Sequence, residues 1–541
     1  MWLESKNTIS LMLEGVNEGC GLTKWFPGKR LSWFRLSIAV VVIAGLGFSG
    51  MQGWSWWHDA REATIRDAWF DGYVDVTATP TFDFANTAPG SAANIVIAFV
   101  VAAKDDPCQP TWGTAYTLDE AGSQLDLDRR LAQLRSSGGS AMVSFGGQLN
   151  DDLAVGCTDH NALVSAYSAV LGRYGVRSID MDIEGRFLEE THAVQRQARA
   201  VADLQTEARE SGEGLDVWLT LPVSLQGLTP DGARAVQAYL DSGVDLAGVN
   251  AMTMNYNSDL GADTNMADAA ESSLSNLHAQ LRSIYNDAQL PLGDATVWSK
   301  IAATPMIGQN EIRGEVFTLD DAIQLNAFAN DRGMVRLSMW SLNRDRTCAE
   351  NWPDTQRVSD SCSGVDQGAT RFIALLSEGR TGEILHDPIE TSSKLVDAKD
   401  IIDDPDLSPY PIWSLDTAYA KKTKIVWRKN VYESNWWTQG DRPDDPLVAV
   451  GANPWRLIGP VLPGEKPIPR PVLPEGALPV WSKSSVYERN SQVMFDGTGF
   501  VAKWWTQGDS PDAGFVVPDS SPWRVLTDDE ILTIIGGDSD Q

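Results

Sequence analysis

Between about residues 71 and 378, eight short apolar runs alternate with segments that have the periodicity of amphipathic helices. The runs have the length and composition of strands, and they are residues 73–77, 94–101, 141–145, 178–183, 217–221, 246–252, 300–305 and 335–340. The helical segments include residues 118–135, 161–174, 191–211 and 319–332. Strands alternating with helices indicate a parallel α/β domain, and eight such units favour a closed (β/α)8 barrel, or TIM barrel. An open doubly wound sheet is the alternative, but no glycine-rich phosphate loop follows the first strand.

Beyond this region, the composition of the 541-residue chain changes twice. An Asp-, Pro- and Ser-rich linker is predicted at residues 379–410, and a proline-rich linker at residues 461–478. The segments on either side of the second linker repeat one pattern at a constant offset of 68 residues, which pairs Trp413 with Trp481, Tyr419 with Tyr487, Trp436 with Trp504 and Trp455 with Trp523. We therefore predict a barrel at residues 68–378, two small all-β units at 411–460 and 479–528, and an acidic tail at 529–541.

An uncharged apolar stretch covers residues 36–57, and it is preceded by Lys24, Lys29, Arg30 and Arg35. The stretch is long enough to cross a bilayer as a helix, and the basic residues would keep residues 1–35 in the cytoplasm. A cleaved signal peptide is the competing interpretation, because residues 36–48 also have the length of a signal-peptide core. Both interpretations export the rest of the chain, either anchored at the extracellular face of the cell membrane or secreted.

Cysteine placement agrees with export. Cys20 lies before the apolar stretch, and the other four cysteines lie after it. Four cysteines can pair in three ways, or remain as free thiols. In an oxidising compartment we expect the pairs Cys108–Cys157 and Cys348–Cys362.

Charge and tryptophan content narrow the choice of partner. Lys and Arg total 43 against 73 Asp and Glu, and the formal net charge of -30 would repel nucleic acid and anionic lipid. The 21 Trp offer flat apolar faces with one N–H donor each, which suits stacking on sugar rings. A neutral partner is therefore expected, and no nucleic acid.

The sharpest local pattern is SIDMDIEG at residues 178–185, in which Asp180, Asp182 and Glu184 alternate with apolar residues. On a strand, this period of two places all three carboxylates on one face, toward the barrel axis and the C-terminal mouth where barrel active sites lie. Carboxylates this close share protons, so one pKa should rise, and a protonated Glu184 could act as a general acid. A calcium loop is the alternative, but the twelfth position counted from Asp180 is Thr191 and not Glu.

This motif resembles the D-x-x-D-x-D-x-E signature of glycoside hydrolase family 18, the chitinases and related endo-N-acetylglucosaminidases. Four further segments look like parts of the same family: SFGG at residues 144–147, NAMTMNY at 250–256, TPMIG at 304–308 and SMWSLNRD at 338–345. The last two look like a bacterial and archaeal chitinase branch. Together, the matching segments span roughly residues 68 to 376.

The resemblance implies a retaining, substrate-assisted reaction in which the substrate's own acetamido oxygen is the nucleophile. It assigns protonation of the glycosidic oxygen to Glu184 and orientation of the N-acetyl group to Asp182, with Asp180 paired to Asp182 beneath them. Tyr256 and Asn255 complete the implied catalytic set. The implied substrate-binding residues are Trp340, as the floor under the sugar, and Met252, Met254 and Ser144.

Two positions depart from the family pattern. Arg177 stands where the signature begins with Asp, and Asn255 replaces an Asp that often neighbours the family's Tyr; Asn can hydrogen-bond but cannot hold charge. Either change could lower activity or move its pH optimum. Structural interpretations also remain open: Trp340 and Tyr256 could be packing residues, while Ser144, Gly146 and Gly147 suit close backbone approach better than catalysis.

The two C-terminal repeats resemble chitin-binding carbohydrate-binding modules of families 5 and 12. Because side chains alternate along a strand, consecutive tryptophans cannot both point inward, and one of each pair should be exposed for binding. The candidate binding residues are Tyr419, Trp436, Trp437, Tyr487, Trp504 and Trp505. Trp413, Trp455, Trp481 and Trp523 are predicted to be core, and the alternative is that all these tryptophans only fill small cores.

Taken together, these patterns predict an endo-acting chitinase, held at the cell surface or released, that acts on chitin or N-acetylglucosamine oligomers as a monomer. No cofactor is required, and the five scattered His form no metal motif. The alternatives are an inactive chitin-binding lectin or adhesin, and an endo-β-N-acetylglucosaminidase that acts on other glycans.

Overall fold

The computed structural model describes residues 67–536, apart from residues 85–93, 258–259, 261–263, 351–353, 355–356, 386–400, 446–447, 449–451, 469–470, 472, 475 and 512–519. The apolar stretch at residues 36–57, and with it the predicted anchor or signal segment, lies outside the described residues. Among the helices that are described, none has the length and apolar character needed to span a membrane.

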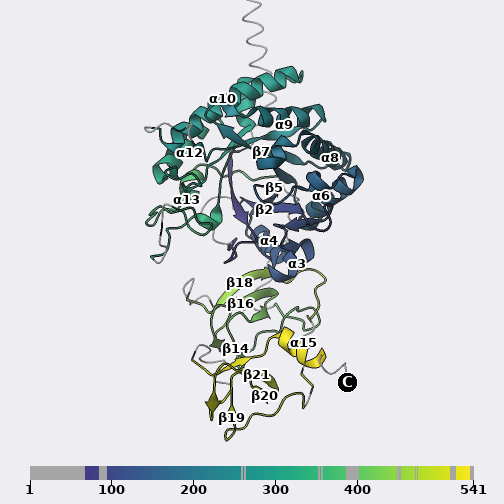
Figure 1. Cartoon of the computed structure of the whole chain (residues 1–541), viewed down its shortest axis with the longest axis vertical. Helices are drawn as coiled ribbons and strands as arrows, with labels where there is room; N and C mark the ends of the chain where they lie inside the picture. Colours follow the sequence, from purple (N-terminus) through teal and green to yellow (C-terminus); the bar gives the residue numbers. More distant parts are fainter. Residues whose placement is uncertain are drawn as a thin grey trace, which may run out of the picture. The chain divides into compact units, whose positions relative to one another are not determined.

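A closed barrel of eight parallel strands forms the larger part of the described chain (Figure 1). Its strands are β1 (Trp69–Asp75), β2 (Asn94–Ala102), β5 (Ser140–Gly146), β6 (Ser178–Asp182), β7 (Asp216–Ser224), β9 (Leu246–Met252), β10 (Ile301–Thr304) and β13 (Arg336–Met339). They run in the order β1-β13-β10-β9-β7-β6-β5-β2, and pairing of β1 with β2 closes the ring. Each of the eight predicted strands is present, so the barrel is confirmed and the open sheet is not.

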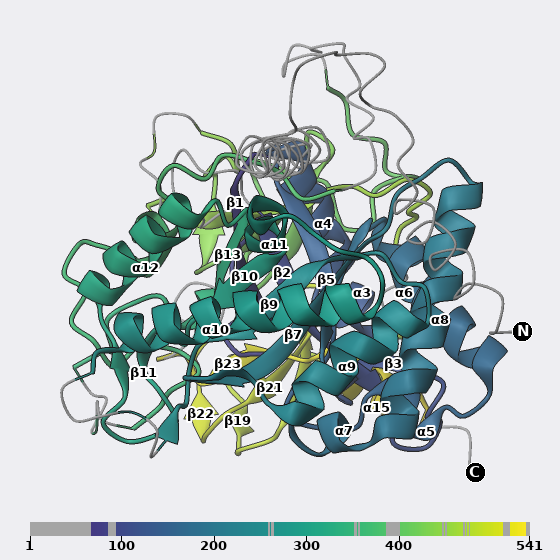
Figure 2. The ribbon, with the colours of Figure 1, turned by 90° about the horizontal axis from the view of Figure 1, so that it is seen from above.

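Helices surround the strands, and Figure 2 shows α6, α8, α9, α10 and α12 outside the ring. The barrel helices are α3 (Leu118–Gln124), α4 (Leu127–Ser136), α5 (Leu153–Gly156), α6 (His160–Tyr174), α7 (Gly185–Glu189), α8 (Thr191–Glu210), α9 (Pro230–Asp241), α10 (Met266–Asp287), α11 (Asp294–Ser299), α12 (Leu319–Arg332) and α13 (Phe372–Leu376). The single helix predicted at 118–135 was wrong. Asp126 has a left-handed φ of 51°, which separates α3 from α4.

Several short strands and turns are added to the barrel. The hairpin β3 (Pro110–Trp112) and β4 (Tyr116–Thr117) extends the edge of β2, and β8 (Gly227–Leu228) pairs with β7. A second hairpin joins β11 (Gly308–Gln309) to β12 (Val316–Phe317), and the 3-10 turn η3 (Leu342–Arg344) follows β13. Both predicted disulfides, Cys108–Cys157 and Cys348–Cys362, are present.

The period of two along each strand creates two separate cores. On β6, Ile179, Met181 and Ile183 pack outward into the large cluster between strands and helices. A smaller cluster fills the barrel interior, and it contains Trp69, Tyr73, Val96, Ala98, Met142, Trp218, Ala302 and Ile384. Because Gly248 on β9 is paired with Trp218, a Cβ there would lie 2.4 Å from the indole ring, so glycine is required beside this bulky interior residue.

Two small β units follow, and they have the same topology. In the first, β14 (Ala418–Tyr419) pairs with β17 (Thr438–Gln439), and β15 (Lys424–Trp427), β16 (Asn430–Ser434) and β18 (Trp455–Pro460) form a sheet. In the second, β19 (Val486–Tyr487) pairs with β22 (Thr506–Gln507), and β20 (Gln492–Phe495), β21 (Thr498–Ala502) and β23 (Trp523–Val525) form the sheet, followed by α15 (Asp528–Gly536).

Equivalent residues make equivalent bonds in the two units. The indole N–H of Trp455 donates to the backbone oxygen of Asp441, and that of Trp523 donates to the backbone oxygen of Asp509, both at 2.9 Å. The predicted repeat is therefore a structural repeat. Its tryptophans build the cores around which each unit folds.

Candidate active site

A cleft of about 350 Å³ opens where the barrel strands end. Six of the residues predicted for the site line it: Asp182, Glu184, Met252, Met254, Asn255 and Trp340. It is also lined by residues that were not predicted for the site, among them Tyr73, Asp75, Phe99, Thr220, Glu311 and Asp360. The acids at the end of β6 therefore line a cleft together with convergent polar and aromatic side chains, as in barrel active sites.

Glu184 lies two residues beyond the end of β6 and directly precedes α7. Its carboxyl group is largely desolvated, and this burial, together with the charge of Glu311, raises its pKa to about 7. A carboxyl group with this pKa is protonated in about half of the molecules at pH 7 and can release its proton to a bound molecule.

Asp182 lies two residues earlier on the same face of the strand. It is 3% exposed, and its Oδ1 has no hydrogen-bond partner among the described residues. Burial raises its pKa well above the usual value, and the charges of Glu184 and Asp180 raise it further. A buried carboxyl oxygen without a partner at the wall of a cleft is suited to receive an N–H donor from a ligand.

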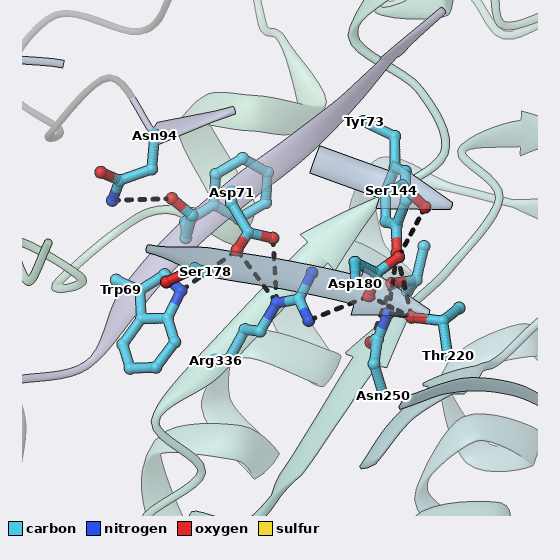
Figure 3. Close-up of polar contacts among 12 residues, drawn as sticks. Trp69, Asp71, Tyr73, Asn94, Ser144, Ser178, Asp180, Thr220, Asn250 and Arg336 are labelled. Carbon is cyan, nitrogen blue, oxygen red and sulfur yellow. Dashed lines mark hydrogen bonds and ion pairs between the residues drawn. The ribbon is translucent and has the colours of Figure 1, made fainter. Parts of the chain in front are cut away.

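Asp180, two residues deeper, is fully buried and surrounded by hydroxyl donors (Figure 3). Its carboxylate accepts bonds from Tyr73 Oη at 2.7 Å, Ser144 Oγ at 2.8 Å and Thr220 Oγ1 at 2.6 Å. Asn250 supports this group by donating to Thr220 at 2.9 Å. The predicted partner of Asp180 was Asp182, and the structure instead gives it donors from three other strands, the adjacent β5 and β7 and the more distant β1.

Trp340 stands at the end of β13 and forms one wall of the cleft. Its ring stacks on that of Phe99, with ring centroids 5.4 Å apart and an angle of 24° between the planes. Its ring centroid lies 6.0 Å from that of Tyr73. Met252 and Met254, from the end of β9, line the same cleft. An aromatic face with adjacent thioethers offers an apolar surface to a ligand.

Besides Asp180, which lies beneath the cleft, two other predicted site residues do not line it. Tyr256 is 4% exposed and lies in the core between strands and helices, where its hydroxyl accepts a bond from Ser273 of α10. The physical reason is the turn before it: Asn255 has a left-handed φ of 55°, and the backbone N–H groups of Tyr256 and Asn257 donate to the Glu315 carboxylate. Tyr256 is thus directed toward α10 and away from the acids.

Ser144 also lies outside the cleft. It is fully buried and donates to Asp180. It was proposed as a substrate-binding residue, but its short side chain points across to the neighbouring strand, where it is paired in register with Asp180. Ser144 therefore positions a carboxylate from within the barrel.

The two residues that depart from the family pattern lie at different distances from the acids of the cleft. Arg177 precedes β6 at the end opposite Glu184, and pairs with Glu213 near the surface. Asn255 lies at the cleft edge, where its Oδ1 accepts from the backbone N–H of Glu311 at 3.1 Å. Arg177 is thus remote from the acids, whereas Asn255 holds a neighbouring carboxylate in place.

In the two small units, some of the predicted binding residues are exposed to solvent and others are buried. Trp436 is 44% exposed, Trp504 43% and Trp505 59%, while Trp437 is partly buried. Tyr419 and Tyr487 were predicted to bind, but they are buried, and each hydroxyl accepts a bond from a backbone N–H five residues earlier, Ser414 and Ser482. Each tyrosine ring packs edge-on against a core tryptophan, Trp455 or Trp523, which explains its burial.

The sequence contains a signal for several site residues that were not predicted. Asp71 and Arg336 each interrupt an apolar strand, as the three acids of β6 do, and a charge in such a strand points either to solvent or into the barrel. Tyr73 lies two residues after Asp71 and therefore shares its face. No comparable local signal marks Glu311, which follows a short strand on a loop.

No protein-family model matches the chain. Among curated proteins, it is 32% identical over 296 residues to the "Probable bifunctional chitinase/lysozyme" of Escherichia coli (strain K12), an alignment that covers 53% of this chain and 32% of that protein. It is 31% identical over 306 residues to "Endochitinase 11" of Metarhizium anisopliae, covering 54% of this chain and 56% of that protein. The chain thus spans about a third and about half the length of these relatives.

Among solved structures, the chain is similar to active domain 2 of a chitinase from Pyrococcus furiosus. The identity is 25%, the TM-score is 0.49, and the match covers 58% of this chain and 95% of that chain.

Proposed function

We propose that the barrel is a glycoside hydrolase of family 18 that cleaves β-1,4-linked N-acetylglucosamine in chitin. The observation that carries this proposal is the pair formed by Glu184, whose pKa is about 7, and Asp182, whose buried Oδ1 has no partner at the wall of the cleft. The names of two curated relatives, a probable chitinase/lysozyme and an endochitinase, support the same class of reaction.

In the first proposed step, the Glu184 carboxyl gives its proton to the glycosidic oxygen. At the same time, the acetamido oxygen of the substrate attacks C1, and the bond from C1 to the leaving sugar breaks. Asp182 accepts the acetamido N–H and stabilises the oxazolinium ion that results. Trp340 supplies the apolar surface beneath the sugar ring.

In the second step, water attacks C1 and the bond between C1 and the acetamido oxygen opens. The Glu184 carboxylate accepts the proton from the water, which restores the starting state of the site. Two displacements at C1 retain the configuration of the sugar, and the need for an acetamido group restricts the substrate to 2-acetamido sugars.

The small units are proposed to bind the same polymer. Trp436, Trp504 and Trp505 are the exposed aromatic side chains that could stack on pyranose faces. Two modules on one chain would raise the local concentration of the barrel at a polymer surface. Endo-type cleavage, action as a monomer, and export by the segment at residues 36–57 belong to the same proposal.

The test compares the full chain with its Glu184→Gln variant in the release of soluble N-acetylglucosamine oligomers from colloidal chitin. Glu189→Gln is the matched control, because Glu189 is an exposed acid on α7, which begins one residue after Glu184. We expect release by the parent and the control, and a loss of roughly 10²- to 10⁴-fold in Glu184→Gln with chitin binding retained.

Other outcomes would change the assignment. Binding of chitin by both proteins, with no release from chitin or from any other N-acetylated glycan, would make the protein a chitin-binding lectin and not a hydrolase. Cleavage of other N-acetylated glycans, with none from chitin, would favour an endo-β-N-acetylglucosaminidase. For the mechanism, release of the α-anomer as the first product would contradict retention of configuration.

A further inference from the structure

The barrel interior holds three fully buried charged side chains that the proposed reaction does not use directly (Figure 3). Arg336, on β13, places its Nε 3.1 and 2.9 Å from the two carboxylate oxygens of Asp71 on β1. Its Nη1 lies 3.5 Å from Oδ1 of Asp180 on β6. One guanidinium therefore contacts two carboxylates, and one of these lies directly beneath the acids of the cleft.

The surroundings hold this guanidinium firmly. The indole N–H of Trp69 donates to Asp71 at 3.1 Å, and the guanidinium carbon of Arg336 lies 4.9 Å from the ring centre of Trp218. The space for Trp218 depends on Gly248, as described above. The tryptophan rings exclude water from the ion pairs, which makes their electrostatic interactions strong.

Strand geometry arranges the charges in a series toward the cleft. Asp71 and Tyr73 lie two residues apart on β1, as do Asp180 and Asp182 on β6, so each pair shares one face. Arg336 contacts the deeper Asp71 and the intermediate Asp180, while Tyr73 donates to Asp180 from the cleft side. Asp180 therefore lies between Arg336 and the acid of the cleft two residues further along β6, Asp182.

Stability alone does not account for these buried charges. Barrel interiors are commonly filled by branched aliphatic side chains, and well-packed apolar residues often stabilise a fold as much as a buried ion pair does. The contact that distinguishes this ion pair is the one to Asp180, two residues below Asp182 on the same strand face.

We propose that Arg336, oriented by Asp71, is a positioning residue that holds the Asp180 side chain in place beneath Asp182 and so sets the electrostatic surroundings of the catalytic acids. This inference rests on the proposed function. The other ionisable groups that face this series are Tyr73 on β1, Glu184 after β6, and Glu311 beside Glu184. In agreement with the geometry, the charge of Asp180 contributes to the raised pKa of Asp182.

Three variants of the full chain separate this role from a structural one. Asp71→Asn removes the anion that competes for Arg336 and repels Asp180. The double variant Asp71→Asn, Arg336→Gln removes both charges together, so neither side chain is left as a buried charge without its partner. The Asn and Gln amides can still form hydrogen bonds in the barrel interior. Arg336→Lys keeps the positive charge but loses the planar fork.

The measurement is the pH dependence of kcat/KM on a soluble chito-oligosaccharide, with thermal unfolding recorded for each variant. An anion that loses a nearby cation takes up a proton at higher pH, so we expect the acidic limb of the double variant to move up by roughly one to three pH units. The acidic limb of Asp71→Asn is expected to move in the opposite direction. Arg336→Lys should keep the limb nearer to that of the parent than the double variant does.

The outcomes decide between the possibilities. An acidic limb in the folded double variant that coincides with the parent's, even at reduced activity, would overturn the positioning role. If the double variant does not fold, the test is the direction in which the acidic limb moves in Asp71→Asn. An acidic limb that stays where it is in the parent, or that moves to higher pH, overturns the proposal. A parent chain that cleaves no N-acetylated oligomer would instead refute the proposed function, which distinguishes the two failures.

Discussion

Glu184 is the residue whose surroundings set the upper pH range of the proposed reaction. Its pKa of about 7 reflects burial first and the charge of Glu311 second. A general acid must carry its proton, so kcat/KM is expected to fall as the pH rises through about 7. The pH dependence of oligosaccharide cleavage by the parent chain measures this basic limb.

Removing the charge of Glu311 should move that limb. In Glu311→Gln the repulsion that favours the protonated form of Glu184 is lost, so its pKa falls and the basic limb moves to lower pH, by roughly half to one unit. Asp360→Asn is the matched control, because Asp360 lines the same cleft but does not contribute to the raised pKa of Glu184. Equal shifts in the two variants would argue against a specific effect of Glu311.

The raised pKa also predicts a stability effect at Glu184. In the unfolded chain the carboxyl should have a pKa near 4.3, so between about pH 4.3 and 7 the folded state binds the extra proton and loses stability as the pH rises. Glu184→Gln should therefore have a higher free energy of unfolding than the parent at pH 7.5, by roughly 1–3 kcal/mol, and no such gain below about pH 4.

Urea unfolding at the two pH values measures this difference. The control Glu189→Gln should show no comparable gain, because Glu189 is exposed. A gain for Glu184→Gln that is the same at both pH values would show that packing, and not the ionisation of Glu184, is responsible.

At the scale of elements, the close approach of β5 to the end of β6 depends on Gly146. Its φ is 102°, and a Cβ there would lie 2.2 Å from the backbone oxygen of Asp182. Gly146→Ala must displace the strand that carries Asp182, so we expect a loss of roughly 3 kcal/mol or more in unfolding free energy, together with lower kcat. Urea unfolding and kcat of this variant therefore test whether Gly146 is needed for close backbone approach.

Gly138→Ala is the matched control for this variant. Gly138 also has a left-handed φ, of 82°, but a Cβ there would meet nothing within 4 Å. The substitution should lose only the conformational free energy of about 1–2 kcal/mol and leave kcat unchanged. Equal losses in the two variants would mean that backbone conformation, and not the contact with Asp182, makes glycine necessary at position 146.

At the scale of the whole molecule, the two small units are expected to act by avidity. Trp436→Ala and Trp504→Ala should each weaken binding to insoluble chitin, and the double variant should weaken it by roughly 10- to 100-fold more than either single variant, because two weak sites act together. Release of oligomers from colloidal chitin should fall in parallel, while cleavage of soluble oligomers stays at the parent rate. Pull-down with chitin particles and the two activity measurements test this.

Tyr487→Phe separates binding from folding in the same experiment. The substitution removes the buried hydroxyl that accepts from Ser482, and leaves the exposed faces of Trp504 and Trp505 unchanged. We expect a lower unfolding temperature of the module with chitin binding retained. If Trp504→Ala binds chitin as the parent does, the exposed tryptophan is not the binding surface.

Much of the fold could be predicted from local periodicity in the sequence. A repeat of two residues located the barrel strands, placed Asp180, Asp182 and Glu184 on one face, and directed the residues between them outward, because side chains alternate on any strand whatever its neighbours are. The repeats likewise identified two copies of one unit, and their tryptophans form the cores. These properties depend on residues close together in the chain.

Only the tertiary structure decided which side chains meet across strands that are distant in the sequence. Asp71 and Arg336 lie 265 residues apart, and the closure of β1 against β13 brings them together. A turn with left-handed residues on both sides of Tyr256, Asn255 and Asn257, directs Tyr256 into the core, and ring packing buries Tyr419, although the patterns around both tyrosines favoured binding. Periodicity determines the face of a strand that a residue occupies, whereas the register between strands and the turns at their ends determine what that residue contacts.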